Sequence, residues 1–498
     1  MPVAVISQQH DVVAVTQSSG PGGANDGATS VVQMTVDFLG ERSETNGNGS
    51  TSPTNGATPT SFGGFDLPPY TDGSDLWSAT QALDGDTYVF FGDGWGLCGQ
   101  ADTGSTMAND QTSFGFGKMT GLPSTGNCPP EWSNVYGGAN SSKPNGGWTG
   151  SNLTSNGGLI LGKVSNVVAI GNDFYGFGAA WRSGDSSNYL NGGHGPPKSG
   201  PNNHLEVLSS TGTGNNGSAW MDSTADLCNG SGTAAAPVWG GGLTVCPAQP
   251  IQFGPGYTGV PSSLAGYVYI YAVTPQSYLG DDASDGTYLV RVPTTQVTTP
   301  SAYQYFAGLD SSGNPIWSSN GNQKQVIFND LIDTKYTYTS ADGTACAGQR
   351  VFMGMGLRDA VYDAPLGRYI ANAQGRAGQV AFFEAHNPWG PWSTIAYTNL
   401  SMSSIYNSGW GMPTPGGLGG GFCTTTSGVS SYQNSSGLGV HIMNGFTDST
   451  GKNIVMTFSS NGLAPPSASA LGGANANPNH NGNEMDSLNM FHAVLTSN

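Results

Sequence analysis

The chain has 498 residues, of which 78 are glycine and only 9% are charged. Its 32 acidic and 14 basic residues give a net charge of −18. Nucleic acids and anionic membrane surfaces, which bind clustered Lys and Arg, are therefore poor partners. Apolar residues make up 36% of the chain, enough for a hydrophobic core, so the chain is not a disordered one. Neutral, hydroxyl-rich polymers such as polysaccharides remain as partners.

The N-terminal part, residues 1–62, is of low complexity and is predicted to be a Gly/Ser/Thr/Asn-rich extension. Within it, residues 31–36 alternate between apolar and polar types, which predicts a strand. This strand could pair with a sheet elsewhere in the chain.

From residue 63 onward, β-rich runs recur in five groups separated by polar loops, at 74–96, 158–208, 267–292, 351–383 and 438–458, with a last run at 488–495. No helical periodicity lies between them. We therefore predict an all-β fold, a five-bladed β-propeller over 63–498. A β-sandwich and a β-helix are the alternatives. The last blade of a propeller takes a strand from the other terminus, and 31–36 or 488–495 could supply it.

The first group, 74–96, predicts a hairpin of two short strands. Asp75 stands at the start of the first strand and Asp93 directly after the second, so the pairing can bring both carboxylates together. Glycoside hydrolysis needs such a pair, one protonated to assist the leaving group and one ionised as nucleophile or base. Turn capping is the alternative, and it is the favoured interpretation of Asp84 and Asp86.

Candidate substrate-binding residues are aromatic side chains, which can stack on sugars, and one of the rare bases. Burial in the core is the alternative for each aromatic, and an ion pair with Asp359 is the alternative for the base. These candidates are Trp77, Trp95, Tyr257, Arg358 and Trp410.

No spacing typical of a transition-metal site links the histidines, so no metal or other cofactor is expected. Residues 281–286 resemble a calcium loop but lack the downstream Glu, which leaves bound calcium as the lesser alternative.

The six cysteines form no Cys-x-x-Cys pair, which indicates disulfides and an oxidising compartment. Nearest-neighbour pairing (98–128, 228–246 and 346–423) is our expectation. No run is long enough for a membrane helix, and residues 1–15 lack the pattern of a signal peptide, so we expect secretion with a signal already removed or by another route. Several Asn-x-Ser/Thr acceptors would make a glycoprotein if the source glycosylates: Asn48, Asn140, Asn152, Asn216, Asn229, Asn399 and Asn434.

Four blocks carry a resemblance to a known family. The first, at 74–96, is Ser-Asp-x-Trp with Asp-Gly-Asp-x-Tyr-x-x-Phe-Gly-Asp-Gly-Trp-Gly, and the second, at 266–293, is Gly-Tyr-Val-Tyr-Ile-Tyr with Leu-Val-Arg-Val-Pro. The third, at 302–310, is Ala-Tyr-Gln-Tyr-Phe-Ala-Gly-Leu-Asp. The fourth, at 361–392, is Val-Tyr-Asp-Ala-Pro-Leu-Gly-Arg-Tyr with Pro-Trp-Gly-Pro-Trp. In this order the blocks resemble a five-bladed β-propeller family formerly catalogued as a domain of unknown function. Its members include glycoside hydrolases, among them endo-D-arabinanases acting on mycobacterial cell-wall arabinan.

The resemblance implies a glycan-hydrolysing propeller whose catalytic pair falls on Asp75 and Asp93. Those enzymes usually have an Arg before the first Asp, where this chain has Ser74. A secreted glycoside hydrolase-like propeller is thus the predicted function. A non-catalytic carbohydrate-binding propeller and an extracellular structural or assembly subunit, of unknown oligomeric state, are the alternatives.

Overall fold

The computed structural model describes most of the predicted strands. The described residues are 13–14, 33–41, 75–92, 96–97, 115–122, 130–136, 161–181, 203–210, 221–233, 236–239, 243–273, 286–328, 337–339, 345–347, 357–374, 379–399, 436–461 and 487–496. Their regular elements are β-strands and short 3₁₀ turns, which confirms the prediction of an all-β chain. Within these ranges no helix has the length and hydropathy needed to cross a membrane.

Five sheets of four to six strands follow one another along the chain. The first contains β3 (Asp75–Gln81), β4 (Thr87–Gly92), β5 (Gly115–Met119) and β6 (Trp132–Tyr136). The second contains β7 (Leu161–Ile170), β8 (Asp173–Trp181), β9 (Asn203–Ser210), β10 (Met221–Thr233) and β11 (Ala236–Trp239). The third contains β12 (Cys246–Pro250), β13 (Tyr267–Val273), β14 (Thr287–Pro293), β15 (Gln304–Leu309), β16 (Pro315–Ser318) and β17 (Val326–Phe328).

The last two sheets combine strands from both ends of the chain. The fourth contains β20 (Leu357–Asp363), β21 (Arg368–Gln374), β22 (Gln379–Ala385), β23 (Ser393–Asn399) and, at its edge, β1 (Val13–Ala14). The fifth contains β24 (Ser436–Ile442), β25 (Asn453–Asn461), β26 (Ser487–Thr496) and β2 (Gln33–Glu41). A separate hairpin joins β18 (Thr337–Thr339) to β19 (Ala345–Ala347), and the 3₁₀ turns are η2 (Pro255–Tyr257), η3 (Ser262–Leu264), η4 (Pro300–Ala302), η5 (Gly321–Gln323) and η8 (Asn444–Phe446).

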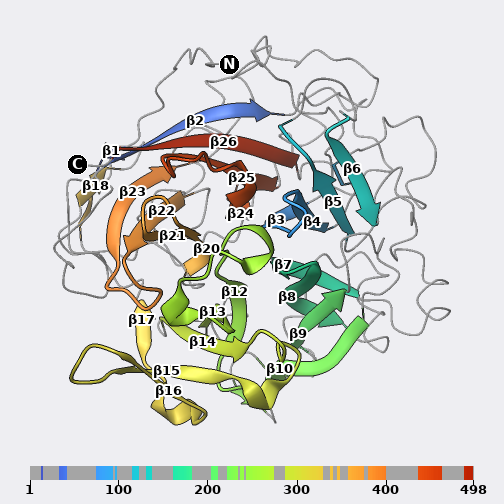
Figure 1. The fold of residues 1–498 in the computed structure, drawn as a ribbon, viewed down its shortest axis with the longest axis vertical. Coiled ribbons are helices and arrows are strands. Elements are labelled where there is room, and N and C mark those ends of the chain that lie inside the picture. Colours follow the sequence, from blue (N-terminus) through green and yellow to red (C-terminus); the bar gives the residue numbers. More distant parts are fainter. Residues whose placement is uncertain are drawn as a thin grey trace.

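The five sheets form a ring in chain order (Figure 1). The first strand of each sheet lies innermost and contacts the first strand of the next, β3 with β7, β7 with β12, β12 with β20, β20 with β24, and β24 again with β3. Later strands of each sheet lie farther out. Contacts between neighbouring inner strands thus run all the way around the ring.

The ring closes in the fifth sheet. β2 pairs with β26 in antiparallel register, from Gln33 opposite Thr496 to Glu41 opposite Asn489. The two predicted closing segments therefore meet there, 31–36 through its described residues 33–36 in β2 and 488–495 in β26, with β2 outermost.

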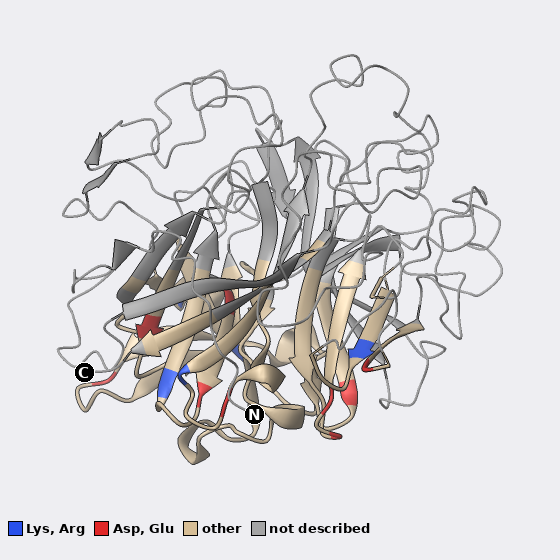
Figure 2. Ribbon diagram, turned by 90° about the horizontal axis from the view of Figure 1, so that it is seen from above, with Lys and Arg blue, Asp and Glu red and all other residues tan. Residues whose placement is uncertain are grey.

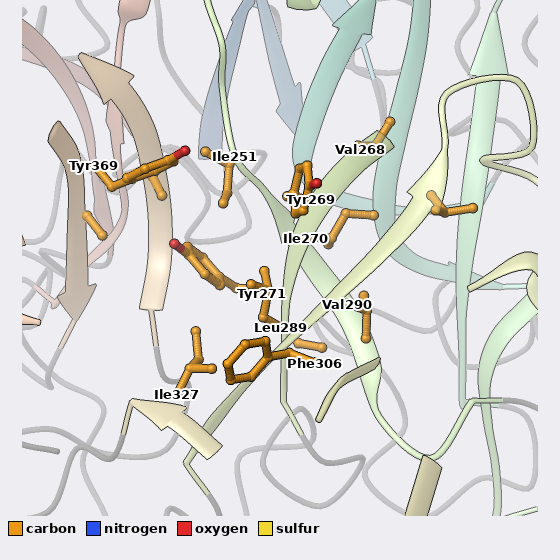
Figure 3. Close-up of a cluster of buried hydrophobic side chains, with 14 of the residues drawn as sticks. Ile251, Val268, Tyr269, Ile270, Tyr271, Leu289, Val290, Phe306, Ile327 and Tyr369 are labelled. Carbon is orange, nitrogen blue, oxygen red and sulfur yellow. The ribbon is translucent and has the colours of Figure 1, made fainter. Parts of the chain in front are cut away.

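The core fills the spaces between sheets. The apolar run of β13 is buried along most of its length because neighbouring sheets cover both of its faces. Tyr271 of β13 and Tyr369 of β21 come from different sheets and enter the same cluster (Figure 3). In the Pro-rich turn, Trp392 is 2% exposed and Trp389 stacks on Phe306 with ring centroids 5.7 Å apart. These two tryptophans are packing residues, as their Pro-rich setting indicates.

Charged side chains are sparse among the described residues. Figure 2 shows charged residues in the short turns at one edge of the ring and on the strands next to these turns. Asp310 and Asp448 each accept backbone hydrogen bonds within such a turn, at 2.8 Å from Asn314 and at 3.1 Å from Thr450. These carboxylates stabilise turns rather than build a charged surface for a partner.

Candidate functional site

The candidate site begins at the edge of the first sheet where β3 starts and β4 ends. Asp75 lies opposite Gly92 in the antiparallel pairing. Asp93 is the next residue of the chain, outside the described residues. The side chain of Asp75 is also outside the description. The predicted hairpin is confirmed, and its backbone brings Asp75 and Gly92 to one edge.

A β-bulge interrupts β3 immediately after Asp75. The pairing moves from Asp75 opposite Gly92 to Ser78 opposite Phe90, which is three steps on β3 against two on β4. Trp77, inside the bulge, has a φ of 38°, a left-handed conformation that is uncommon for residues other than glycine. Bulges re-aim side chains next to active sites, and strained backbone gathers at functional sites. The bulge marks the start of β3 as a specialised segment.

The chain after Asp93 returns to the sheet at Gly96. Gly96 has a φ of 77°, and a Cβ there would lie 2.4 Å from Asn134 Oδ1 and from a ring carbon of Phe91. The next residue, Leu97, is fully buried, and its N–H donates to Asn134 Oδ1 at 2.8 Å. The end of β4 and Leu97 therefore fix both ends of the short segment that carries Asp93.

The structure corrects the sugar-binding role predicted for Trp77. Its side chain is 0% exposed and packs against Phe91, with ring centroids 5.7 Å apart. It belongs to a cluster that includes Met443 and Val455 of the fifth sheet. Its backbone oxygen accepts a hydrogen bond from Thr457 Oγ1 at 3.0 Å. Trp77 is therefore a wedge between the first and last sheets.

Tyr257 is also a core residue, contrary to prediction. Its side chain is 6% exposed, its φ is 68°, and its ring packs against Phe253 with centroids 5.0 Å apart. Its hydroxyl accepts a hydrogen bond from the Tyr269 N–H at 2.9 Å. Burial raises its pKa well above the ordinary value. No face of this ring is open to a sugar.

Several other predicted features lie partly or wholly outside the described residues. Arg358 is in β20, but its side chain is not described. Trp95, Trp410 and the calcium-like loop at 281–286, except for its last residue, are not described at all. The described part of the chain has no free cysteine, and the three pairings stay predictions.

The acids at the opposite end of the hairpin are turn residues, as predicted. Asp84 Oδ1 accepts the Asp86 N–H at 3.1 Å, and Asp84 Oδ2 accepts the Tyr88 hydroxyl at 2.8 Å. Lys118 pairs with Asp86 and lies 3.6 Å from Asp84. Since these carboxylates are held within one turn, they are suitable controls for the acids at the other end.

Buried polar side chains join the inner strands of neighbouring sheets. Between the first and second sheets, Ser78 Oγ accepts the Val167 N–H at 3.1 Å and Thr80 Oγ1 accepts the Ala169 N–H at 2.9 Å. Gln252, just after β12, accepts from Thr80 Oγ1 at 2.8 Å and donates to the Val167 oxygen at 2.6 Å. This network of buried side chains joins the first three sheets.

The third and fourth sheets are joined by backbone hydrogen bonds and by the Tyr271 hydroxyl, which donates to Pro388 O at 3.0 Å. The Gln252 N–H donates to Ala360 O at 2.8 Å, and the Tyr362 N–H donates to Gln252 O at 2.8 Å. Asn166 of β7 also donates to Gln249 of β12. Gln252, which follows β12 of the third sheet, thus connects this sheet to the first, second and fourth sheets.

One ionisable pair lies near the axis, and its role was not predicted from the sequence. Asp359 of β20 is 4% exposed, and its Oδ2 accepts the Ile442 N–H at 2.5 Å. His441 Nδ1 of β24 is 3.9 Å from the same oxygen. Burial raises the pKa of Asp359 to about 7, although two backbone hydrogen bonds oppose the shift. An acid among apolar residues of a predicted strand is the signal for this pair in the sequence, although Arg358 beside it predicts a local ion pair instead.

Within the described ranges, no group of three or more His, Cys, Asp or Glu side chains is arranged to hold a metal ion.

No family model and no curated protein matches the chain. Among solved structures, it is similar to a GH43_1 enzyme from Xanthomonas citri, with 11% identity, a TM-score of 0.33, and coverage of 84% of this chain and 86% of that one. An α-L-arabinofuranosidase from Fusarium graminearum has 10% identity, a TM-score of 0.30, and coverage of 84% and 92%. An exo-β-1,3-galactanase from Phanerochaete chrysosporium has 8% identity, a TM-score of 0.32, and coverage of 86% and 60%. At this level the similarity does not assign the chain to a family.

Proposed function

We propose that the five-sheet ring is a five-bladed β-propeller that hydrolyses a glycan, with Asp75 and Asp93 as its carboxylate pair. The observation that carries the proposal is the pairing of Asp75 with Gly92 at the edge of the first sheet. The resemblance of residues 74–96 to the catalytic hairpin of the propeller hydrolases supports it. A secreted location follows from the substrate and from the cysteine usage.

Backbone geometry keeps Asp75 and Asp93 close enough to act as a catalytic pair. Paired Cα atoms in an antiparallel ladder lie about 5.5 Å apart or closer, and consecutive Cα atoms about 3.8 Å. The Cα atoms of Asp75 and Asp93 are therefore within about 10 Å of each other. Glycosidases set their two carboxyl groups about 5 to 9.5 Å apart, the shorter separation for retention and the longer for inversion. This hairpin can supply either geometry.

The two carboxyls would divide the work. One protonates the glycosidic oxygen as the bond to the anomeric carbon breaks. The other attacks that carbon or removes a proton from the attacking water. Two carboxylates so close repel each other, and this raises the pKa of one of them, which keeps the acid protonated near neutral pH.

The test is release of reducing ends from a panel of furanose and pyranose polysaccharides. Asp75→Asn and Asp93→Asn should each lower the rate by about 10²-fold or more, since acid–base groups contribute on that order. Asp84→Asn, on the same hairpin but at its turn, should keep most of the activity. Substantial activity in both Asp75→Asn and Asp93→Asn would contradict the assignment of these two residues as the catalytic pair. Polysaccharide binding without any release would instead establish the carbohydrate-binding alternative.

A further inference from the structure

The boundary between the fourth and fifth sheets differs chemically from the other four. In the described contacts between neighbouring inner strands, the hydrogen-bonding side chains are hydroxyls and amides, except at this boundary, where a carboxyl takes part. Asp359 of β20 accepts the Ile442 N–H of β24. Asn372 of β21 supports the same contact by donating to Val440 O at 3.0 Å.

A second buried carboxyl lies at the other end of the same boundary. Asp363, the last residue of β20, is 3% exposed and packs against Gly451 in the turn between β24 and β25. A Cβ on Gly451 would lie 2.8 Å from Asp363 Oδ2, so the two elements are in close contact. Asp363 Oδ1 accepts the Leu366 N–H at 3.1 Å, and Oδ2 has no hydrogen-bond partner among the described residues.

Strand geometry explains why both carboxyls meet the fifth sheet. Side chains at i and i+4 of a strand point to the same face. Asp359 and Asp363 share the face toward β24, while Ala360 and Tyr362 share the other face and pack in the core with the third sheet.

Several described residues are charged or titratable neighbours of the two carboxyls. Asp359 faces His441 of β24. Asp363 has Asp448 nearby in the turn, which acts on it through its charge. Arg368 lies opposite Asp363 in strand register but makes its ion pair with Glu384, at 3.5 Å. Lys452 in the same turn donates its backbone N–H to Asp448 at 3.2 Å.

We propose that this boundary is a pH-dependent latch, which holds β20 against β24 in mildly acid solution and weakens as the solution becomes neutral and then alkaline. When protonated, Asp359 and Asp363 place no charge between the sheets. When ionised, each leaves a desolvated negative charge there, and at Asp363 that charge is repelled by Asp448.

The direction follows from proton linkage. Burial raises the pKa of Asp359 to about 7, and burial together with Asp448 raises that of Asp363 to about 6, both above the ordinary 3.8. Between pH of about 4 and about 7 the folded boundary thus holds more protons than the unfolded chain. Its stabilising contribution is complete at the acid end of this window and is lost as the pH rises through the two folded values.

Hydrogen exchange of the full chain tests the latch locally. Exchange is measured at about pH 5 and at about pH 8, and each rate is corrected for the intrinsic rate at that pH. From the lower to the higher pH, protection of the amides in 436–442 should fall by about tenfold or more, while protection in 267–273 should change much less. In Asp359→Asn, whose amide oxygen can still accept from Ile442, this difference should shrink, and in the variant that carries both Asp359→Asn and Asp363→Asn it should largely disappear. Asp310→Asn is the matched control, because it removes one negative charge from a fully exposed turn of the third sheet.

Two outcomes would overturn the proposal. One is equal loss of protection in both segments, which would indicate repulsion spread over the whole acidic chain. The other is an unchanged difference in Asp359→Asn and in Asp363→Asn. If Asp359→Asn does not fold, the test uses Asp363→Asn and the comparison of protection in 436–442 with protection in 267–273 of the unaltered chain.

Discussion

Gly96 is the residue that fixes how the chain leaves the candidate site. Alanine there would need a left-handed backbone and would also meet Asn134 and Phe91. We expect Gly96→Ala to destabilise the protein by about 2–4 kcal/mol and to lower hydrolysis, because backbone strain and overpacking add. Thermal unfolding and the reducing-end assay measure the two effects.

Gly85 provides the control for Gly96. It has a φ of 89°, but a Cβ there would meet nothing within 4 Å. Gly85→Ala should therefore cost only the conformational strain, about 1–2 kcal/mol, and leave hydrolysis unchanged. Equal destabilisation by the two substitutions would show that the contacts of Gly96 do not matter.

Some features of individual residues could be predicted from the sequence and others could not. The hairpin at 74–96 and its turn acids were predictable, because Asp-Gly turns and β-rich runs are local signals. The burial of Trp77 was not, since it depends on Met443 and Val455, far away in the chain. The burial and raised pKa of Asp359 could not be predicted for the same reason, because the strand that it contacts, β24, is also far away in the chain.

At the scale of elements, Thr80 and Gln252 join three sheets through side chains. Thr80→Val keeps the shape but leaves the Ala169 N–H without its acceptor and Gln252 without its donor. We expect a loss of about 1–3 kcal/mol for each buried group left without a partner. The midpoint of urea unfolding measures it.

Thr258→Val is the comparison for Thr80→Val. Thr258 is exposed, and its hydroxyl donates only to Pro255 O at 2.8 Å within a 3₁₀ turn. It should change stability by less than about 0.5 kcal/mol. If the two variants unfold at the same midpoint, the side-chain network does not stabilise the ring.

Strand order was predictable at this scale only in part. The five groups of runs correspond to five sheets because each sheet is built from strands that are consecutive in the chain. β1 and β2 are the exceptions, and alternation in 31–36 predicted the second as a strand without naming its partner. The sheet that an N-terminal strand joins depends on how the whole ring closes, and this cannot be predicted from a local sequence pattern.

For the whole molecule, closure by β2 should set the stability of the fifth sheet. Deleting residues 1–41 removes β2 and exposes the backbone edge of β26. We expect a melting temperature several degrees below that of a chain lacking only 1–32, together with self-association. Calorimetry and light scattering of the two truncations make the comparison, and identical melting curves would contradict it.

The pairing of Gln33 with Thr496 also sets an order of events during synthesis. β2 leaves the ribosome long before its partner β26, because the strands of all five sheets lie between them in the chain. Until β26 follows, the apolar face and open edge of β2 are available to other chains. The residues that follow β2, 42–62, are poor in apolar side chains and rich in Gly, Ser, Thr and Asn, a composition that does not drive association during that delay.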